Sequence, residues 1–183
     1  MNKAVFLDRD GVIVKNINGE ASRKASDLKL IKSSIPVIKK LQKKGFVVIV
    51  VSNQPDISLG LIDEKTKEEI AKKFRELLSK EKINLDIYYC FHHANGVFKK
   101  YAKNCSCHKP KPGMLLRAIN KYNIDPKLSY IVGDRASDIK AGSLVGVKTI
   151  LVDPKHQEKK YLQQYNVEPK FIIKKIDEVL NII

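Results

Sequence analysis

The sequence lacks tryptophan and contains only three cysteines and two methionines in 183 residues. The cysteines all lie between positions 90 and 107. An odd number of cysteines confined to one short segment cannot form a disulfide framework distributed over the chain. We therefore expect no structural disulfides, and the clustering indicates a local metal site instead.

Long hydrophobic runs are also absent, and no stretch approaches the roughly 18 consecutive apolar residues of a membrane-spanning helix. Only four apolar residues precede the charged Asp8, Arg9 and Asp10, so the apolar core of a signal peptide is missing. We expect a cytoplasmic protein without a membrane partner. The length and the 43% of hydrophobic residues predict a single domain over residues 1–183, which we expect to be a monomer.

Arginine is scarce, because the formal net charge of +15 rests on 30 lysines and only five arginines. Arginine is the residue that grips phosphates and base edges with two bonds, so an excess of lysine is a weak indication of nucleic-acid binding. Aromatic residues, at 7%, offer few platforms for stacking bases. Many lysines stand beside glutamates in helix-like stretches such as 65–73, which favours solvated helix faces over a nucleic-acid partner.

What the chain does contain is an alternation of apolar runs and amphipathic stretches, which predicts an α/β fold with a doubly wound, Rossmann-like parallel sheet. The predicted strands are residues 4–7, 46–51, 86–91, 129–132 and 148–152, with a short one at 171–173. The predicted helices run from Ser33 or Ser34 to Gly45, from Asp63 to about Lys80, from Pro112 to Tyr122 and up to Leu144, with two less regular ones at 154–165 and 176–182.

Polar residues end three of these strands, and ligands of such sheets bind at the carboxyl ends of the strands. Asp8 and Asp10 follow the first strand, Ser52 and Asn53 the second, and Asp134 the fourth. Two carboxylates at one strand end need a counter-charge, and Mg²⁺ held by carboxylates and a substrate phosphate would supply it. The alternatives are an ordinary Asp-Gly turn after the first strand and, after the fourth, acidic residues favoured at a helix N-terminus.

A second cluster consists of Cys90-Phe91-His92 and Cys105-Ser106-Cys107. Three thiolates and one imidazole in two tight pairs match a closed, tetrahedral structural Zn²⁺ site, in which His93 could replace His92. The polar loop between the pairs has no core of its own, so a metal would hold it in place. The alternative is one buried cysteine within an incidental cluster.

Taken in order, the motifs resemble the haloacid dehalogenase superfamily. They are Asp8-x-Asp10-Gly11-Val12, two apolar residues before Ser52-Asn53, Lys109-Pro110, and Gly133-Asp134-x-x-x-Asp138-Ile139. The resemblance implies a sheet of strand order 3-2-1-4-5 and Mg²⁺-dependent phosphoryl transfer through an aspartyl-phosphate. It implies Asp8 as nucleophile, Asp10 as general acid and base, and Ser52 and Lys109 as stabilisers of the phosphoryl group. The implied Mg²⁺ ligands are Asp8, Asp134 and the backbone carbonyl of Asp10, with Asp138 bracing them; the expected substrate contacts are Arg9, Asn53, Gln54, His108 and Arg135.

The run from Cys90-Phe91-His92 through Cys105-Ser106-Cys107-His108-Lys109-Pro110 is similar to the zinc-containing heptose 1,7-bisphosphate and histidinol-phosphate phosphatases. That resemblance implies a zinc-stapled loop over residues 90–107, no large cap domain, and Zn²⁺ ligands Cys90, His92, Cys105 and Cys107. The implied reaction removes the 7-phosphate of D-glycero-D-manno-heptose 1,7-bisphosphate, a step in carbohydrate metabolism toward lipopolysaccharide precursors. Histidinol phosphate, a 3′-phosphorylated nucleic-acid end, or a non-catalytic zinc-bearing module are the alternatives.

The sequence departs from that subgroup around the substrate. His108 stands where the subgroup usually has arginine, residues 55–60 lack its usual small residues and Arg-Gly, and residues 16–19 replace its Gly-Tyr. Histidine cannot grip a second phosphate with two bonds as arginine can. The chemistry is therefore predicted more sharply than the substrate.

Overall fold

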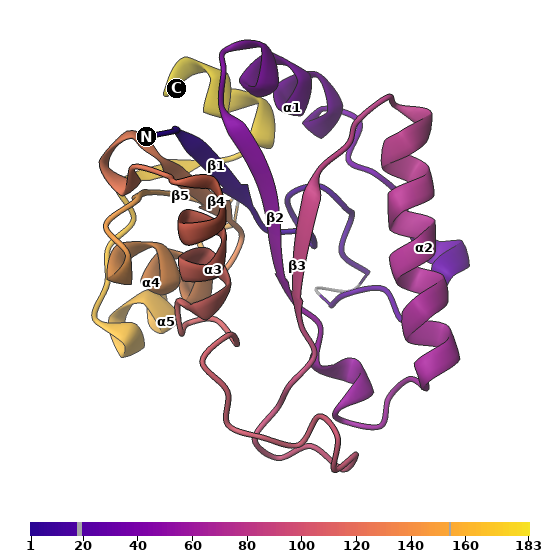
Figure 1. Cartoon of the computed structure of the whole chain (residues 1–183). Coiled ribbons are helices and arrows are strands. Elements are labelled where there is room, and N and C mark those ends of the chain that lie inside the picture. The colour runs from indigo at the N-terminus through magenta and orange to yellow at the C-terminus, as the bar shows by residue number, and fades with distance from the viewer. Residues whose placement is uncertain (18–19, 154) are drawn as a thin grey trace.

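A computed structural model describes residues 1–17, 20–153 and 155–183. Six parallel strands form one sheet in the order β3-β2-β1-β4-β5-β6 (Figure 1). They are β1 Ala4–Leu7, β2 Val47–Asn53, β3 Asp86–Cys90, β4 Tyr130–Gly133, β5 Lys148–Val152 and β6 Phe171–Ile173. The predicted order of the first five strands is confirmed, and the short β6 extends the sheet beyond β5.

Helices connect the strands at close to the predicted positions. They are α1 Ser34–Lys43, α2 Glu64–Lys80, α3 Gly113–Tyr122, α4 Ala136–Leu144 and α5 Lys159–Tyr165, with short 3-10 helices η1 Ala25–Asp27, η2 Pro55–Ile57, η3 Pro126–Leu128 and η4 Ile176–Asn181. The helix expected at 154–165 is helical only as α5, and Pro154 lies outside the described residues. The stretch at 176–182 forms the 3-10 helix η4, where an ordinary helix was expected.

The N-termini of two helices show how far the local sequence predicts helix capping. The Asp63 side chain accepts a hydrogen bond of 2.7 Å from the Thr66 backbone N–H, so the predicted cap of α2 is confirmed. At α1 the cap differs from the expectation. Ser33 occupies the N-cap position without a side-chain cap bond, and the Ser34 hydroxyl donates backward to the Ile31 carbonyl at 2.7 Å.

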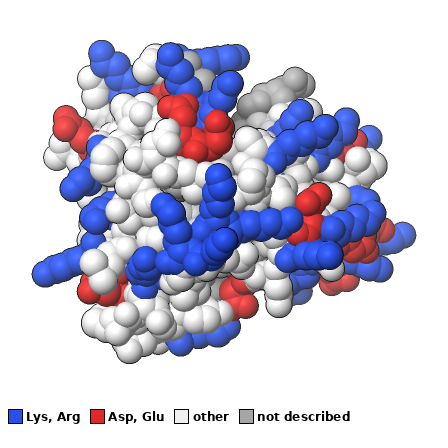
Figure 2. Space-filling model, turned by 90° about the horizontal axis from the view of Figure 1, so that it is seen from above, with Lys and Arg blue, Asp and Glu red and all other residues white. Residues whose placement is uncertain are grey.

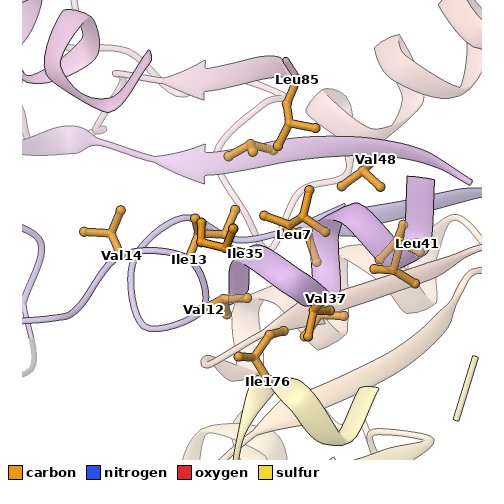
Figure 3. Close-up of a cluster of buried hydrophobic side chains, with 14 of the residues drawn as sticks. Leu7, Val12, Ile13, Val14, Ile35, Val37, Leu41, Val48, Leu85 and Ile176 are labelled. Carbon is orange, nitrogen blue, oxygen red and sulfur yellow. The ribbon is translucent and has the colours of Figure 1, made fainter. Parts of the chain in front are cut away.

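Both faces of the sheet are covered, which explains why its strands are apolar throughout. One face packs against α1, α2 and η4, and Figure 3 shows part of this cluster, with side chains from β1, β2, α1 and η4 facing one another. The other face packs against α3 and α4. Neighbouring residues of β1 such as Val5 and Phe6 serve opposite clusters and are both fully buried. Each such side chain contributes about 1.5–3 kcal/mol relative to an exposed one.

The strand order reverses at β1, because the chain runs from β1 to β2 and β3 on one side and returns to β4, β5 and β6 on the other. The carboxyl ends of β1, β2 and β4 therefore meet at one edge, which is the lower edge in Figure 1. The long segment from β3 to α3 runs past this edge. No large cap domain is inserted in the part of the chain that the structure describes.

The positive charge is prominent at the opposite edge. Figure 2 views the molecule from the amino ends of the strands and shows Lys and Arg side chains across the middle of that face. The exposed lysines of α1 (Lys39, Lys40 and Lys43) illustrate the solvated helix faces expected from the sequence. Within residues 1–17, 20–153 and 155–183, no helix is long and apolar enough to span a membrane.

Candidate active site and metal centre

Lys109 lies at the centre of the polar cluster. Its Nζ donates hydrogen bonds to Asp8 Oδ1 at 2.7 Å, to Asp138 Oδ1 at 2.5 Å and to the Val51 carbonyl at 2.7 Å. The lysine is buried. Burial opposes its charged form, but the carboxylates of Asp138 and Asp8 outweigh that effect and raise the pKa of Lys109. Lys109 is therefore a fixed positive charge between two acidic side chains from different elements.

Asn53 holds the backbone of Lys109 in place. Its amide nitrogen donates to the Lys109 carbonyl at 3.0 Å, and its amide oxygen accepts from the Lys109 N–H at 3.0 Å. The residue that ends β2 thus pins a segment that arrives from β3, more than fifty positions later in the chain. This paired contact explains how a lysine on a long irregular segment is aimed at the end of β1.

Asp8, Asp134 and Asp138 bring one carboxylate oxygen each within 4.8 Å of one another. Burial, followed by repulsion from Asp8 and Asp138, raises the pKa of Asp134 to about 8. Its Oδ2 accepts a hydrogen bond of 2.9 Å from Asn16, while its buried Oδ1 has no hydrogen-bond partner. An unpartnered buried carboxylate oxygen beside two further carboxylates fits a hard divalent cation with oxygen ligands.

Two glycines make this proximity possible. Gly11 has φ +80°, and a Cβ there would lie 1.9 Å from Asp134 Oδ2. A Cβ on Gly133 would lie 2.2 Å from Asp138 Cβ and Cγ. Asp138 in the first turn of α4 accepts at 3.2 Å from the Arg135 N–H. The glycines beside Asp10 and Asp134 are therefore needed for space, and the Asp-Gly motif is more than a simple turn.

Asp10 points toward a different set of partners. Its Oδ2 accepts from Arg9 Nε at 3.0 Å and from Gln54 Nε2 at 2.7 Å, and its Oδ1 accepts from Arg9 Nη2 at 3.1 Å. Burial raises the pKa of Asp10, and the neighbouring Arg9 charge offsets this only in part. The same Gln54 amide nitrogen lies 3.0 Å from the Ser52 hydroxyl oxygen.

A cavity of about 550 Å³, called here the central cavity, opens over these groups. It is lined by Asp8, Asp10, Asn53, His108, Lys109, Arg135 and Asp138, with Glu20, Arg23 and Asp56 among its other lining residues. A second cavity of about 600 Å³ adjoins Asp134 and Arg135 on the side of β5 and β6. Of the five expected substrate contacts, Asn53, His108 and Arg135 line the central cavity.

Arg9 and Gln54 do not line the central cavity, which differs from the expectation. Arg9 is only 1% exposed and its guanidinium lies between the rings of Phe74 and Tyr89. The guanidinium of Arg9 is thus held by Asp10 outside the lining of the central cavity. The physical reason is the direction of the chain at the end of β1, where Arg9 turns toward α2 and β3.

The second predicted cluster comes together at the end of β3. The Sγ atoms of Cys90, Cys105 and Cys107 lie 3.1–3.6 Å apart, and His92 Nδ1 lies 3.3 Å from Cys107 Sγ and 3.7 Å from Cys90 Sγ. Ligands bound to Zn²⁺ at about 2.3 Å in a tetrahedron would lie about 3.8 Å apart. All three cysteines are free thiols. The donor set and its spacing therefore fit a closed zinc site.

The two neighbouring histidines have other surroundings. His93 Nδ1 accepts from the Asn95 N–H at 3.2 Å, so His92 is the histidine that the geometry places with the thiols. His108 donates its backbone N–H to Cys105 Sγ at 3.3 Å, and its Nδ1 lies 3.8 Å from Cys90 Sγ. Burial lowers the pKa of His108, which favours the neutral ring. His108 thus lies between the cluster of three thiols and the central cavity.

Asn16 and Arg23 belong to the site, but no motif in the sequence predicts this. Asn16, which bonds Asp134, stands in a polar, aperiodic stretch after β1. Arg23 from the same stretch pairs with Glu20 at 2.7 Å and with Asp56 at 3.2 Å on the wall of the central cavity. Only the folded path of the loop brings these residues to the strand ends, because neither periodicity nor spacing marks them.

Comparisons with known proteins agree with this geometry. Residues 106–179 match the family model described as HAD-hydrolase-like. The D-glycero-beta-D-manno-heptose-1,7-bisphosphate 7-phosphatase of Pasteurella multocida is 39% identical over 154 residues, which are 83% of this chain and 82% of that protein. The D-glycero-alpha-D-manno-heptose-1,7-bisphosphate 7-phosphatase of Photorhabdus laumondii is 38% identical over 79% of each chain. The crystal structure of a D,D-heptose 1,7-bisphosphate phosphatase from B. bronchiseptica, complexed with magnesium and phosphate, has a TM-score of 0.80 at 25% identity and covers 98% of this chain and 96% of its own.

Proposed function

Because the chain belongs to the haloacid dehalogenase-like hydrolases and is a phosphatase of that family, we propose that it removes the 7-phosphate of D-glycero-D-manno-heptose 1,7-bisphosphate. The observation that carries the proposal is the convergence of Asp8, Asp10 and Lys109 on one cavity, in a chain so similar to phosphatases of this substrate. The enzyme would act as a cytoplasmic monomer, formed by residues 1–183 as a single domain.

Asp8 is the proposed nucleophile. Its carboxylate lines the central cavity and would attack phosphorus, forming an aspartyl-phosphate while the bond from phosphorus to the sugar oxygen breaks. Lys109, already 2.7 Å from Asp8 Oδ1, would stabilise the charge on the transferring phosphoryl oxygens. The Ser52 hydroxyl oxygen lies beside the Gln54 amide nitrogen, which leaves its proton free to be donated to the same group.

Asp10 is the proposed general acid and base. In the first step it would protonate the departing sugar oxygen, and in the second it would take a proton from the water that hydrolyses the aspartyl-phosphate. The raised pKa of Asp10 favours a carboxyl group able to carry that proton. Both steps need Asp10 close to Asp8, and both residues line the same cavity.

Phosphatases of this family use Mg²⁺, and the carboxylates of Asp8 and Asp134 with the backbone carbonyl of Asp10 would hold it here. Bound Mg²⁺ would offset the repulsion between the Asp8 carboxylate and an incoming phosphate. Asp138 would brace the cluster through its bond to Lys109. The unpartnered Oδ1 of Asp134 supports this assignment.

Zinc would be structural, held by Cys90, His92, Cys105 and Cys107. The role fits the position of the cluster, because only His108 separates Cys107 from Lys109 in the chain. A closed site at this point would fix where the lysine enters the centre of the cluster.

We predict one tightly bound zinc ion per chain and its loss in Cys105→Ser. Turnover should fall about tenfold or more, since the position of Lys109 loosens, while the sheet stays folded. Elemental analysis, circular dichroism and phosphate release measure the three effects. Ser106→Ala, between the ligands, is the matched control. Unchanged metal content in Cys105→Ser would refute the ligand assignment.

A substitution at His108 tests whether this position contacts the second phosphate of the substrate. We expect His108→Arg to raise kcat/KM for the 1,7-bisphosphate more than for a heptose 7-monophosphate, by up to about a hundredfold, since a charged hydrogen bond contributes ~1.5–3 kcal/mol. His93→Arg, which lies outside the cavity lining, is the control, and zinc content is checked in both. Equal changes for the two substrates would show that residue 108 does not contact the second phosphate.

The experiment that tests the proposed function is a phosphate-release screen with Mg²⁺ and with EDTA. Its substrates are the alpha and beta anomers of heptose 1,7-bisphosphate, histidinol phosphate and a 3′-phosphorylated oligonucleotide. The highest kcat/KM should belong to a heptose bisphosphate and should vanish with EDTA. A preference for histidinol phosphate or for the oligonucleotide would replace the proposed substrate, and no turnover of any of them would overturn the proposal.

A further inference from the structure

We propose that Arg9 and Gln54 are positioning residues that hold Asp10 for proton transfer. This inference rests on the proposed function, because it concerns the residue assigned there as general acid and base. Both side chains bond Asp10, and neither lines the central cavity.

Arg9, Gln54 and Asp10 form a closed ring of hydrogen bonds. The guanidinium of Arg9 grips both oxygens of Asp10, with Nε at 3.0 Å from Oδ2 and Nη2 at 3.1 Å from Oδ1. Gln54 donates from Nε2 to Asp10 Oδ2 at 2.7 Å and accepts at Oε1 from Arg9 Nη2 at 2.7 Å. A two-point grip on a carboxylate restricts its rotation as well as its position.

The ring is anchored outside the active site. Arg9 Cζ lies 5.9 Å from the ring centre of Phe74 on α2 and 5.9 Å from that of Tyr89 on β3. Asp10 is the acidic partner of Arg9 among the ion pairs of the described residues. A buried guanidinium left without its carboxylate strongly destabilises the fold, so the ion pair between Arg9 and Asp10 stays closed.

One contact indicates that this ring positions Asp10 and is more than an ordinary buried ion pair. Gln54 Nε2 lies 3.0 Å from Ser52 Oγ as well as 2.7 Å from Asp10 Oδ2. In the proposed mechanism Ser52 holds the phosphoryl group and Asp10 serves the leaving oxygen. A single amide thus sets the spacing between the groups that act on the two sides of the bond that breaks.

The ring also distinguishes the two oxygens of Asp10. Oδ2 accepts two hydrogen bonds, whereas Oδ1 accepts one, the longer bond from Arg9. Oδ1 is therefore the oxygen that we assign to proton transfer, since it gives up less when it is protonated. A displacement of about 1 Å at this oxygen is enough to slow a positioned reaction by about a hundredfold.

The test uses the fact that a general acid helps a poor leaving group more than a good one. For a sugar phosphate, kcat/KM includes protonation of a departing alkoxide, whereas a nitrophenolate leaves without a proton. We expect Arg9→Lys and Gln54→Ala to lower kcat/KM for the heptose bisphosphate by about ten- to a hundredfold and that for 4-nitrophenyl phosphate by less than about threefold. Asp10→Asn should show the same dependence on the leaving group, and adding Arg9→Lys to it should cause little further loss.

Arg117→Lys is the matched control, because Arg117 on α3 lies over the ring of Tyr88 of β3 at 5.6 Å without an ion pair to a described residue. It should leave both rates unchanged. Circular dichroism checks the fold of each variant. If Arg9→Lys does not fold, the result for Gln54→Ala, at a half-buried position, decides between the outcomes. Equal losses with the two substrates, or no loss with either, would overturn the positioning role. Failure of the wild-type enzyme to hydrolyse either substrate would instead overturn the proposed function.

Discussion

Asp8→Asn is expected to abolish phosphate release, with kcat at least about a hundredfold below wild type, a loss of more than ~2.7 kcal/mol in transition-state stabilisation. The amide has nearly the shape of the carboxylate but cannot attack phosphorus. The protein should stay folded, since Lys109 keeps its contacts with Asp138 and the Val51 carbonyl. Phosphate release and circular dichroism measure the two effects.

Asp27→Asn, an acidic residue on the exposed η1, is the control and should retain full activity. The covalent step has its own readout. If Asp10 is the general base as proposed, Asp10→Asn should slow hydrolysis of the aspartyl-phosphate. With 4-nitrophenyl phosphate, a phosphoryl group should then accumulate on the peptide that contains Asp8 and be detected by mass spectrometry after acid quenching. Activity of Asp8→Asn above about one per cent of wild type would contradict the assignment of Asp8 as nucleophile.

Lys109→Met is expected to damage stability and catalysis together. It removes the positive charge between Asp8 and Asp138, and breaking a buried ion pair by deleting one partner costs about 3–5 kcal/mol. Loss of a donor to the phosphoryl oxygens should lower kcat by a further factor of about 10²–10³. Urea unfolding and steady-state kinetics measure the two effects.

The sign of the pH dependence makes this prediction specific. Burial, only partly offset by Lys109, already raises the pKa of Asp138 to about 6, and removing the lysine raises it further. A carboxyl group whose pKa is higher in the folded than in the unfolded state favours folding while it is protonated. This contribution to the free energy of unfolding is lost as pH rises and the group ionises. The loss in free energy of unfolding caused by Lys109→Met should therefore become smaller as pH falls from 7 toward 4. Lys111→Met changes an exposed neighbour and should not lower the free energy of unfolding. A deficit independent of pH would contradict the ion-pair explanation.

The fold could be predicted from the sequence because its strands are buried on both faces. Runs such as 4–7 and 46–51 have no polar residue to suggest a solvent-facing side, and the helices between the strands require parallel connections. The 3-10 helix η4 was not predicted, since its apolar spacing is compatible with either kind of helix. The predicted strand 46–51 extends to Asn53, because Ser52 and Asn53 still pair with β3.

The motifs predicted which side chains gather near the strand ends, whereas their catalytic roles stay predictions. Asp8, Asp134 and Lys109 meet as their motifs imply. Arg9 was among the substrate contacts that the resemblance implies, but its guanidinium pairs with Asp10. It also lies beside the rings of Phe74 and Tyr89, which are far along the chain, and no local pattern shows that an arginine faces them.

The segment between β3 and α3 has a consequence for how such an enzyme diversifies. It starts after Cys90, the last residue of β3, and carries Cys105, Cys107, His108 and Lys109. Asp8, Ser52 and Asp134 belong to the ends of three other strands. A zinc ion held there as proposed would fix both ends of this segment, so the residues between the two ligand pairs could be lengthened or replaced without moving Asp8, Ser52 or Asp134. Substitutions between the two ligand pairs can then accumulate in such enzymes while Lys109, whose backbone Asn53 bonds at 3.0 Å, stays at the end of β1.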